Sequence, residues 1–296
     1  MENSLGELLA EANQIVLGKD RQIRLAVCCL LSKGHLLIED LPGVGKTTLS
    51  HALAKLFGMS YQRIQFTSDI IGSSMFVPDQ QQFQFHSGPL FNQMVLADEI
   101  NRATPKAQSA LLEAMEERRV TVDGVTYTLP EPFFVVATQN PSYHVGTFPL
   151  PESQLDRFLM RIELGYPDQQ AERELLTGQS RQLLLETMPV KMSFEHLQQL
   201  QAGTEGVYTS PALLDYVQAI IAFTRHSGVY PWGLSPRAGL ALLTAAKSWA
   251  WMEGREAVLP EDVQAVLPAV VGHRLRAEQA DSEQIVAPIL HEVPVL

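Results

Sequence analysis

Short apolar runs alternate with amphipathic stretches through the first 165 residues. The clearest amphipathic stretches, 46–57 and 104–118, carry apolar residues three or four positions apart, which is the spacing of one helix face. In the second, Thr104 suits the N-cap and Pro105 the first helical position. We expect the apolar runs to be strands, at residues 36–39, 63–67, 94–99, 133–138 and 158–164. Strands that alternate with helices predict a largely parallel α/β sheet.

Two segments interrupt this alternation. Residues 120–127 place Asp123-Gly124 between β-type residues, and this dipeptide is typical of a two-residue hairpin turn. The expected cross-strand pairs are Val122–Val125 and Val120–Tyr127. Residues 75–91 carry alternating phenylalanines and several turn-forming residues. They predict either a second hairpin or an irregular loop.

The β-type signal fades after Pro167. Helical patterns follow, separated by turns that contain glycine and proline, at residues 170–185, 194–201, 211–226, 236–251 and 261–275. We therefore place a domain boundary near Pro167, with an α/β domain over 1–167 and an all-helical domain over 168–296. The tail after Arg276 carries few structural signals.

The most informative stretch for chemistry is LLIEDLPGVGKTT, residues 36–48, in which an apolar strand runs into a glycine-rich loop and a helix begins at Lys46. The backbone N–H groups of such a loop converge on phosphate oxygens, and the helix N-terminus adds positive potential. Lys46 would reach the β- and γ-phosphates, and Thr47 would offer its hydroxyl to Mg²⁺. The pattern G-x-x-x-x-G-K-[ST] is incomplete, because Asp40 occupies its first glycine position. Aspartate tolerates a left-handed backbone, but its carboxylate must point away from the phosphates.

Two further apolar runs lead into polar residues that suit the same site. The run at 94–99 ends in Asp98-Glu99, at the edge of the expected sheet where α/β proteins bind ligands. Asp98 would hold Mg²⁺, and Glu99 would orient and polarise the attacking water. The run at 133–138 leads to Asn140, which would position that water. Each of these patterns alone is weak evidence for a nucleotide site. Their order along the chain, after the glycine-rich loop, strengthens the prediction.

Five motifs occur in order: PGVGKT at 42–47, DEINR at 98–102, ATQNP at 137–141, LDRF at 155–158 and LSPR at 234–237. Together they resemble the AAA+ ATPases, and specifically the MoxR family, over nearly the whole chain. The resemblance implies a P-loop AAA+ parallel-sheet domain followed by an all-helical lid domain. The segments 75–91 and 120–127 are similar to the helix-2 insert and to the hairpin that precedes the sensor strand in that family.

The resemblance also implies roles for individual residues. The nucleotide would be bound by Pro42, Gly43, Val44, Gly45, Lys46, Thr47 and Thr48, with Val16 and Gly18 in the segment that packs on adenine. Mg²⁺ would be held by Thr47 and Asp98, with Glu99 as the catalytic glutamate and Asn140 as sensor 1. Arg157 would be the arginine finger that reaches the nucleotide of the neighbouring subunit, and Arg237 would be sensor 2 in the lid.

Both arginines also have simpler interpretations. Arg157 follows Asp156 and could pair with it on the surface. Arg237 follows Pro236 at the start of a predicted helix and could be a solvated first-turn residue. A guanidinium is nonetheless well suited to the spread charge of a phosphoryl group. Either role requires an oligomer or a closed lid.

Composition narrows the classes of protein that the chain can belong to. The 296 residues carry a net charge of −11, and acids outnumber bases on both sides of Pro167, which disfavours a nucleic-acid-binding module. No apolar run approaches the roughly 18 residues of a membrane span, and the first residues do not resemble a signal peptide. The two cysteines, Cys28 and Cys29, are adjacent, which excludes a disulfide framework and fits a reducing compartment. We expect a cytoplasmic, globular protein.

The phosphate-site motifs predict an Mg²⁺-dependent ATPase that binds ATP, and the resemblance implies that it forms a ring, expected to be a hexamer. The resemblance implies chaperone-like remodelling or maturation of protein clients, together with a partner that bears a von Willebrand factor A domain. Two alternatives remain open: a helix-2-insert motor that acts on nucleic acid, and a nucleotide-gated scaffold with little turnover. ATPase activity stimulated by DNA would favour the first, and a phosphate-release assay decides the second.

Overall fold

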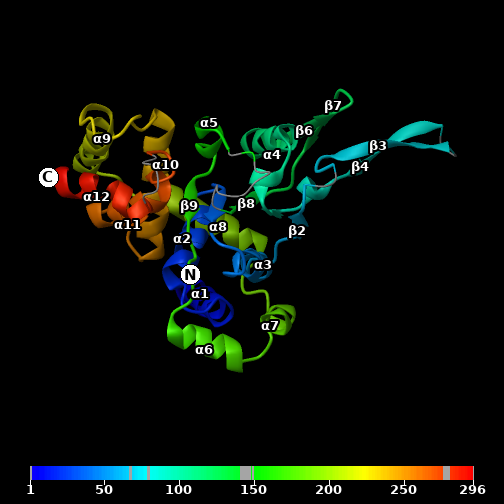
Figure 1. Ribbon diagram of the computed structural model, residues 1–296, viewed down its shortest axis with the longest axis horizontal. Coiled ribbons are helices and arrows are strands. Elements are labelled where there is room, and N and C mark those ends of the chain that lie inside the picture. The colour runs from blue at the N-terminus through cyan, green and yellow to red at the C-terminus, as the bar shows by residue number, and fades with distance from the viewer. Residues whose placement is uncertain are drawn as a thin grey trace.

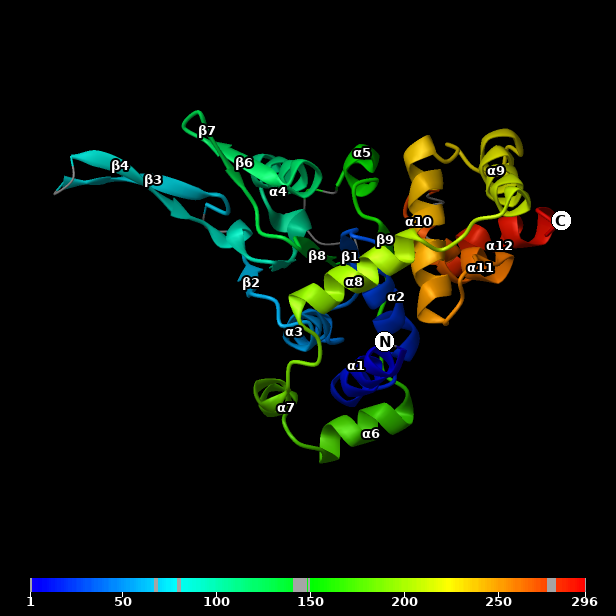
Figure 2. The same ribbon diagram turned by 180° about the vertical axis from the view of Figure 1, so that it is seen from behind.

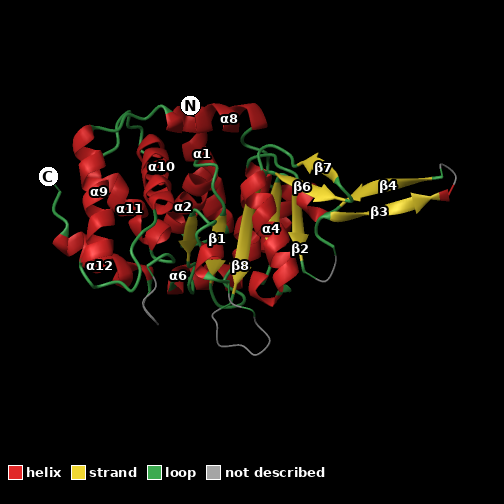
Figure 3. Ribbon diagram, turned by 90° about the horizontal axis from the view of Figure 1, so that it is seen from above, coloured by secondary structure: helices red, strands yellow, loops and turns green. Residues whose placement is uncertain are grey.

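The computed structural model describes residues 2–66, 69–78, 81–140, 148, 150–275 and 281–295. Within these residues, five parallel strands form one sheet in the order β2-β5-β8-β1-β9 (Figures 1 and 3). The strands are β1 (Leu36–Glu39), β2 (Tyr61–Ile64), β5 (Met94–Ala97), β8 (Phe134–Gln139) and β9 (Met160–Ile162). The predicted parallel α/β sheet is confirmed. Only β2 lies clearly earlier than predicted, because its residues pair with β5 from Tyr61 onward.

The central strands serve two hydrophobic cores, because a strand directs alternate side chains to opposite faces of the sheet. Leu36 and Ile38 of β1 pack in one core and Leu37 in the other. The helices that cover the two faces are α1 (Glu2–Ile15), α2 (Asp20–Leu31) and α3 (Lys46–Leu56) on one side and α4 (Pro105–Glu117) on the other (Figure 1). Burial of both faces explains why these strands are apolar at consecutive positions.

Two antiparallel hairpins project from one end of the molecule (Figures 1 and 2). The hairpin of β6 (Arg119–Val122) and β7 (Val125–Thr128) has the predicted register, with Val122 opposite Val125 and Val120 opposite Tyr127. The segment that was predicted as a hairpin or an irregular loop forms a hairpin of β3 (Gly72–Val77) and β4 (Gln82–Ser87), followed by a single 3₁₀ turn, η2 (Pro89–Phe91). The two hairpins contact each other, because the ring of Phe85 stacks on that of Tyr127 with 4.1 Å between centroids.

The segment after Pro167 is helical, as predicted, although some bounds differ. Its helices are α6 (Gln169–Thr177), α7 (Arg181–Thr187), α8 (Phe194–Glu205), α9 (Pro211–His226), α10 (Pro236–Met252), α11 (Pro260–Val271) and α12 (Ser282–Glu292). The single helix predicted at 170–185 is wrong: the chain breaks at Gly178, and the Arg181 guanidinium donates to the Gln14 carbonyl of α1 (2.8 Å). Helix α12, N-capped by Asp281, was not predicted.

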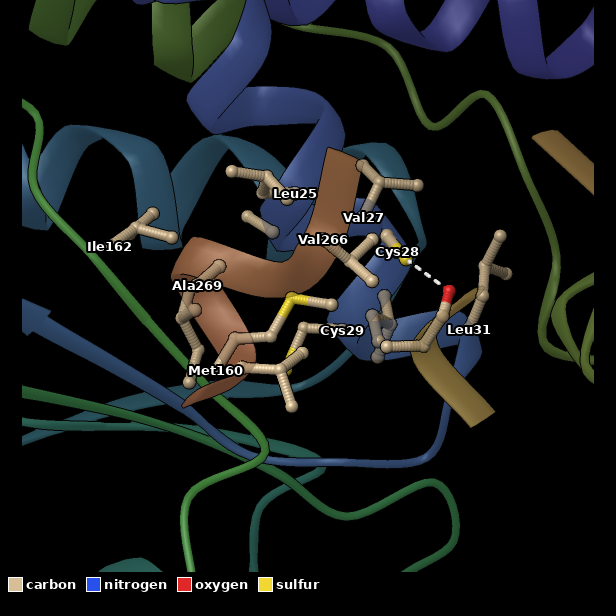
Figure 4. Close-up of a cluster of buried hydrophobic side chains, with 14 of the residues drawn as sticks. Leu25, Val27, Cys28, Cys29, Leu31, Met160, Ile162, Val266 and Ala269 are labelled. Atoms are coloured by element: carbon tan, nitrogen blue, oxygen red, sulfur yellow. Dashed lines mark hydrogen bonds between the residues drawn. The ribbon is translucent and has the colours of Figure 1, made fainter. Parts of the chain in front are cut away.

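Helix α2 is the centre of the larger core (Figure 4). Cys28 and Cys29 are fully buried on it, near Met160 of β9 and Val266 of α11. The Cys28 thiol donates a hydrogen bond to the Ala245 carbonyl of α10 (3.3 Å), and burial raises the pKa of both thiols, so the cysteines serve packing. This core joins helices from both sides of Pro167, and the domain boundary there stays a prediction.

Of the helices in the described part of the chain, none is both long enough and apolar enough to cross a membrane.

Candidate functional site

The glycine-rich loop connects β1 to α3 at the carboxyl edge of the sheet. Gly43 and Gly45 have φ angles of +86° and +100°, a conformation that side chains rarely adopt. A Cβ added at either glycine would meet no atom within 4 Å, so the space beside the loop is open. Helix α3 begins at Lys46 directly after Gly45 and presents its unpaired N–H groups to that space. The loop therefore has the shape and polarity of an anion site.

The carboxylate of Asp40 is held by backbone N–H groups, and Asp40 is not among the residues that line the cavity beside the loop. Its Oδ2 atom accepts hydrogen bonds from the backbone N–H groups of Leu164 and Gly165, at 2.6 Å each. Its Oδ1 atom accepts from the N–H of Leu41 at 2.7 Å. Asp40 does not have a positive φ, so the left-handed backbone that we considered for it is not used. Its function in the fold is to tie the end of β1 to the segment after β9.

Lys46, the first residue of α3, is buried beside the glycine-rich loop. Its ammonium group donates to the Asp40 and Leu41 carbonyls of the loop and to Oδ1 of Asn140 (3.0 Å). Burial lowers the pKa of Lys46, whereas the charges of Asp40, Asp98 and Glu99 act in the opposite direction. Loop carbonyls and an amide oxygen therefore stabilise the ammonium, and phosphate oxygens would offer it stronger, charged acceptors.

Asp98 follows β5 and has partners on two strands. Its Oδ1 atom accepts from the Thr138 hydroxyl of β8 at 2.6 Å. Its Oδ2 atom accepts from Arg63 of β2, through Nε at 3.0 Å and through Nη2. The carboxylate is thus held at the sheet edge with a guanidinium beside it. Sequence patterns did not predict Arg63 in this site, because nothing local to β2 indicates which residue of β5 it will face.

Glu99 has a left-handed backbone, with φ at 53°, which is uncommon for a residue other than glycine and concentrates at functional sites. Its N–H donates to the Thr138 hydroxyl (2.9 Å). Its carboxylate accepts from Nδ2 of Asn140 (2.9 Å) and pairs with Arg102 (3.1 Å). Asn140 therefore bridges Lys46 and Glu99, so the glycine-rich loop and the predicted catalytic glutamate belong to one hydrogen-bond network.

The predicted phosphate and metal residues surround one cavity of about 350 Å³. It is lined by Pro42, Gly43, Gly45, Lys46, Thr47, Thr48, Arg63, Asp98, Glu99 and Asn140. Thr47 and Asp98 supply a hydroxyl and a carboxylate, which are oxygen donors of the kind that Mg²⁺ prefers beside phosphate. The residues present therefore fit the predicted ion. Val44 does not line the cavity but packs against the larger core.

Val16 and Gly18 lie outside this cavity as well. Val16 is buried, and a Cβ at Gly18 would approach Ala171 of α6 at 3.2 Å. Lys19 donates to the Tyr166 carbonyl (2.7 Å), next to the Gly165 N–H that Asp40 holds. The N-terminal segment is therefore joined to the glycine-rich loop through residues 164–166, and contact of Val16 and Gly18 with adenine stays a prediction.

Arg157 and Arg237 lie together, away from the cavity around Lys46. Both pair with the carboxylate of Glu116 on α4 and line a second cavity of about 340 Å³. Asp156, which we considered as a surface partner for Arg157, pairs instead with Arg274 (2.7 Å), so that interpretation is wrong. Arg237 lies in the first turn of α10 and its side chain is 52% exposed, as the simpler interpretation expects, and it also pairs with Glu116. Its role as sensor 2 stays a prediction.

Similar proteins agree with the motif-based assignment. A model of the ATPase family associated with various cellular activities (AAA) matches residues 35–160, and an AAA lid domain model matches residues 222–290. The crystal structure of a proposed ATPase from Cytophaga hutchinsonii has a TM-score of 0.88 and 33% identity, and the match covers 100% of this chain and 96% of that one.

Relatives of known sequence match over most of their length. An uncharacterized protein of Bacillus subtilis, YeaC, is 41% identical over 98% of this chain and 94% of its own. Chaperone MoxR1 of Mycobacterium tuberculosis is 40% identical over 92% and 76%, and protein MoxR of Paracoccus denitrificans is 33% identical over 90% and 86%. With the AAA fold and the ordered pocket described above, these matches establish that the chain belongs to the MoxR family of AAA+ ATPases.

Proposed function

We propose that this protein binds ATP with Mg²⁺ in the cavity around Lys46 and hydrolyses its terminal phosphate. The observation that carries the proposal is the hydrogen-bond network Lys46–Asn140–Glu99. It places an ammonium group that can bind phosphate and a candidate general base in one cavity. Thr47 and Asp98 would hold Mg²⁺, which neutralises phosphate charge when bound.

Each residue of the network has a distinct task in this proposal. Lys46 would exchange its loop carbonyls for phosphate oxygens. Glu99 would accept a proton from the attacking water, and the amide of Asn140 would keep the Glu99 carboxylate in the orientation that this transfer needs. The Thr138 hydroxyl fixes both Asp98 and the backbone of Glu99, which supports the two carboxylates from the adjacent strand.

The test is a phosphate-release assay on the Glu99→Gln variant. Glutamine keeps the shape of the side chain but cannot accept the proton, so turnover should fall by about 10²–10⁴-fold while ATP affinity stays within a factor of a few. Unchanged turnover would contradict the assignment of Glu99 as the base. If wild-type protein showed no turnover although ATP bound, the nucleotide-gated scaffold would be correct.

We also infer that the active form is a ring, expected to be a hexamer, in which Arg157 serves the nucleotide of a neighbour. Its support is the position of Arg157 and Arg237, which line a cavity other than the one around Lys46. Mixing Arg157→Ala subunits with Lys46→Ala subunits tests this arrangement. The first kind keeps a sound nucleotide pocket and the second kind keeps the arginine, so mixed rings should recover activity. Absence of recovery in rings shown to be mixed would contradict action in trans.

The work of hydrolysis would be chaperone-like remodelling of protein clients, in keeping with the name of chaperone MoxR1, with a von Willebrand factor A domain protein as the expected partner. The β3–β4 hairpin supports a client role, because Phe83 is 72% exposed and packs edge to face on the exposed Phe76. Capture of partners on the Glu99→Gln variant with ATP present, compared with a Phe83→Ser version of the same variant, tests whether clients bind there.

A further inference from the structure

Among the residues that the structure describes, Glu116 is the acidic side chain that pairs with both predicted transition-state arginines. It lies in the last turn of α4, where its Oε2 atom accepts from Nη1 of Arg157 and its Oε1 atom from Nη2 of Arg237. Arg157 follows the short helix α5 (Glu152–Leu155), whereas Arg237 is the second residue of α10, and the two residues are 80 positions apart. One carboxylate therefore joins two segments that approach each other only in the folded chain.

Of the other cations that line this cavity, Lys33 and Arg274 pair with carboxylates of the same subunit, Lys33 with Glu205 at 2.7 Å. Arg274 is buried and pairs with Asp156, and it also donates to the Phe158 carbonyl at 2.7 Å. Arg118 donates to the Phe133 and Lys33 carbonyls. Glu116 thus faces two guanidinium groups with a single negative charge, which leaves the group with a net charge of +1. Hydrogen bonding from Arg237, with the positive charge of Arg157, lowers the pKa of Glu116, so its carboxylate is ionised at neutral pH.

Arg157 has a second contact with the same helix, because its Nη1 atom donates to the Leu112 carbonyl at 2.9 Å. The two α4 groups restrict a long side chain that would otherwise sample many rotamers. Arg237 is held by Glu116 alone among the contacts of its guanidinium in the described residues. Glu116 therefore determines where the Arg237 guanidinium lies relative to that of Arg157.

Helix α4 also reaches back to the cavity around Lys46. Gln108 in its second turn donates to the Ile100 carbonyl (3.0 Å), directly after Glu99, and Asn101 donates to the Asn140 carbonyl (3.2 Å). At ~1.5 Å per residue, the 13 residues of α4 span ~20 Å. The helix is thus a rigid connection between the Glu99 segment at one end and the arginine pair at the other.

We propose that Glu116 is a positioning residue that holds Arg157 and Arg237 as a pair facing the nucleotide of the neighbouring subunit. The inference rests on the proposed function, since it needs a neighbour with ATP bound. An isolated ion pair at this exposure contributes at most ~1 kcal/mol to folding stability. Loss of the carboxylate should therefore change catalysis far more than stability, which a purely structural salt bridge would not do.

The experiment uses Glu116→Gln in the full-length chain, with Glu117→Gln as the matched control. Glu117 is the next residue of α4 and pairs only with the exposed Arg119 among the ion pairs of the described chain. For Glu116→Gln we expect ATP affinity unchanged within twofold, a Tm within about 3 °C of wild type, and turnover reduced at least tenfold. Glu117→Gln should retain at least half of the wild-type turnover.

Subunit mixing then separates a positioning role from a defect in the variant's own pocket. Glu116→Gln subunits mixed with Lys46→Ala subunits should recover activity, because the latter supply an intact arginine pair. The same subunits mixed with Arg157→Ala subunits should stay inactive, because both partners lack the donated arginine function. In an Arg157→Ala background, Glu116→Gln should lower turnover by clearly less than tenfold, because only the contact of Glu116 with Arg237 is then left to lose.

Turnover at or above the wild-type level in Glu116→Gln would overturn the inference. So would failure of Glu116→Gln to complement Lys46→Ala under conditions in which Arg157→Ala does complement it, and in that case the proposed function would stand. If Arg157→Ala also failed to complement, the arrangement in trans and the inference would fall together.

Discussion

The cavity around Lys46 and the arginine pair at Glu116 are built in different ways. The first is made by residues at the carboxyl ends of neighbouring strands, and its Lys46, Asn140 and Glu99 groups are bound to one another. The second joins an arginine from the α/β region to one from the helical segment, through a carboxylate on a third element. The groups around Lys46 are fixed by the sheet, whereas the arginines that we propose for a neighbour's site depend on a contact between distant segments.

The largest effects are expected at Lys46 and Arg157, where a loss of ATP binding can be distinguished from a loss of turnover. Lys46→Ala removes the ammonium from the phosphate site and should weaken both ATP binding and turnover, the latter by about 10²–10³-fold. Arg157→Ala should lower turnover by about 10³-fold or more and leave ATP binding by its own subunit unchanged. Equilibrium binding of a fluorescent ATP analogue, measured beside steady-state phosphate release, checks both. A loss of affinity in Arg157→Ala rings would show that the two regions are not separate.

A second prediction concerns Asp40. Replacing it with glycine completes the sequence pattern of the phosphate loop but removes the acceptor of two 2.6 Å backbone hydrogen bonds. We expect the free energy of unfolding to fall by about 2–4 kcal/mol, because hydrogen bonds to a charged group contribute about 1.5–3 kcal/mol each and partial relaxation recovers some of this. Chemical denaturation measures the change. The Asp40→Asn variant keeps one of the two side-chain acceptor oxygens, so its free energy of unfolding should fall by less.

A third prediction concerns His35, which is hydrogen-bonded both to β8, the strand of Thr138, and to α4, the helix of Glu116. It precedes β1, accepts from the Val135 N–H at Nδ1 (3.0 Å) and donates from Nε2 to the Met115 carbonyl of α4 (3.2 Å). Burial lowers the pKa of His35 to about 3. Between that value and its usual pKa near 6.5, the unfolded chain binds the proton and the folded chain does not, so stability falls as the pH is lowered through this range.

The measurement for His35 is the free energy of unfolding against pH from 7 to 5. The contribution of one such histidine approaches about 1.4 kcal/mol per pH unit well below pH 6.5. Burial also lowers the pKa of His273, so the wild type contains a second contribution of the same sign. His35→Gln keeps one donor and one acceptor but does not titrate. The slope of its free energy of unfolding against pH should therefore be smaller by the contribution of one proton. An equal slope would contradict the assignment.

The smallest effect is expected at Arg63, whose guanidinium occupies Oδ2 of Asp98. Arg63→Gln removes a cation that competes with a metal ion for this carboxylate. We expect the Mg²⁺ concentration needed for half-maximal ADP affinity to fall by about three- to tenfold, corresponding to about 1 kcal/mol. Calorimetric titration of ADP at several Mg²⁺ concentrations checks this. A rise would show instead that Arg63 contacts the nucleotide directly.

Sequence alone predicted the features whose signals are local. The turn Asp123-Gly124 predicted its hairpin register, and the N-cap and first-turn proline of α4 predicted where that helix begins. The glycine-rich loop was recognisable because its chemistry is contained in consecutive residues. The polar residues that follow the apolar runs predicted the sheet edge. The family resemblance predicted the helical lid, and an AAA lid domain model matches residues 222–290.

Features that depend on distant partners were not predictable in the same way. Nothing around Glu116 distinguishes it from Glu117, although only Glu116 contacts both arginines. The break at Gly178 is followed by packing of α7 against α1, and Asp40 is explained by Leu164 and Gly165, which are more than 120 residues away in sequence. In each case the determining contact is made by a segment that the local pattern does not contain.

Helix α4 does not end in a free loop. Arg118 adopts a left-handed conformation and the chain enters β6 at once, while Tyr127 of β7 is stacked on Phe85 of the longer hairpin. A rotation of α4 would therefore be transmitted to both hairpins. Because the hairpins project far from the helix, a small rotation of α4 would displace Phe76 and Phe83 much further, and this is where we propose that clients bind.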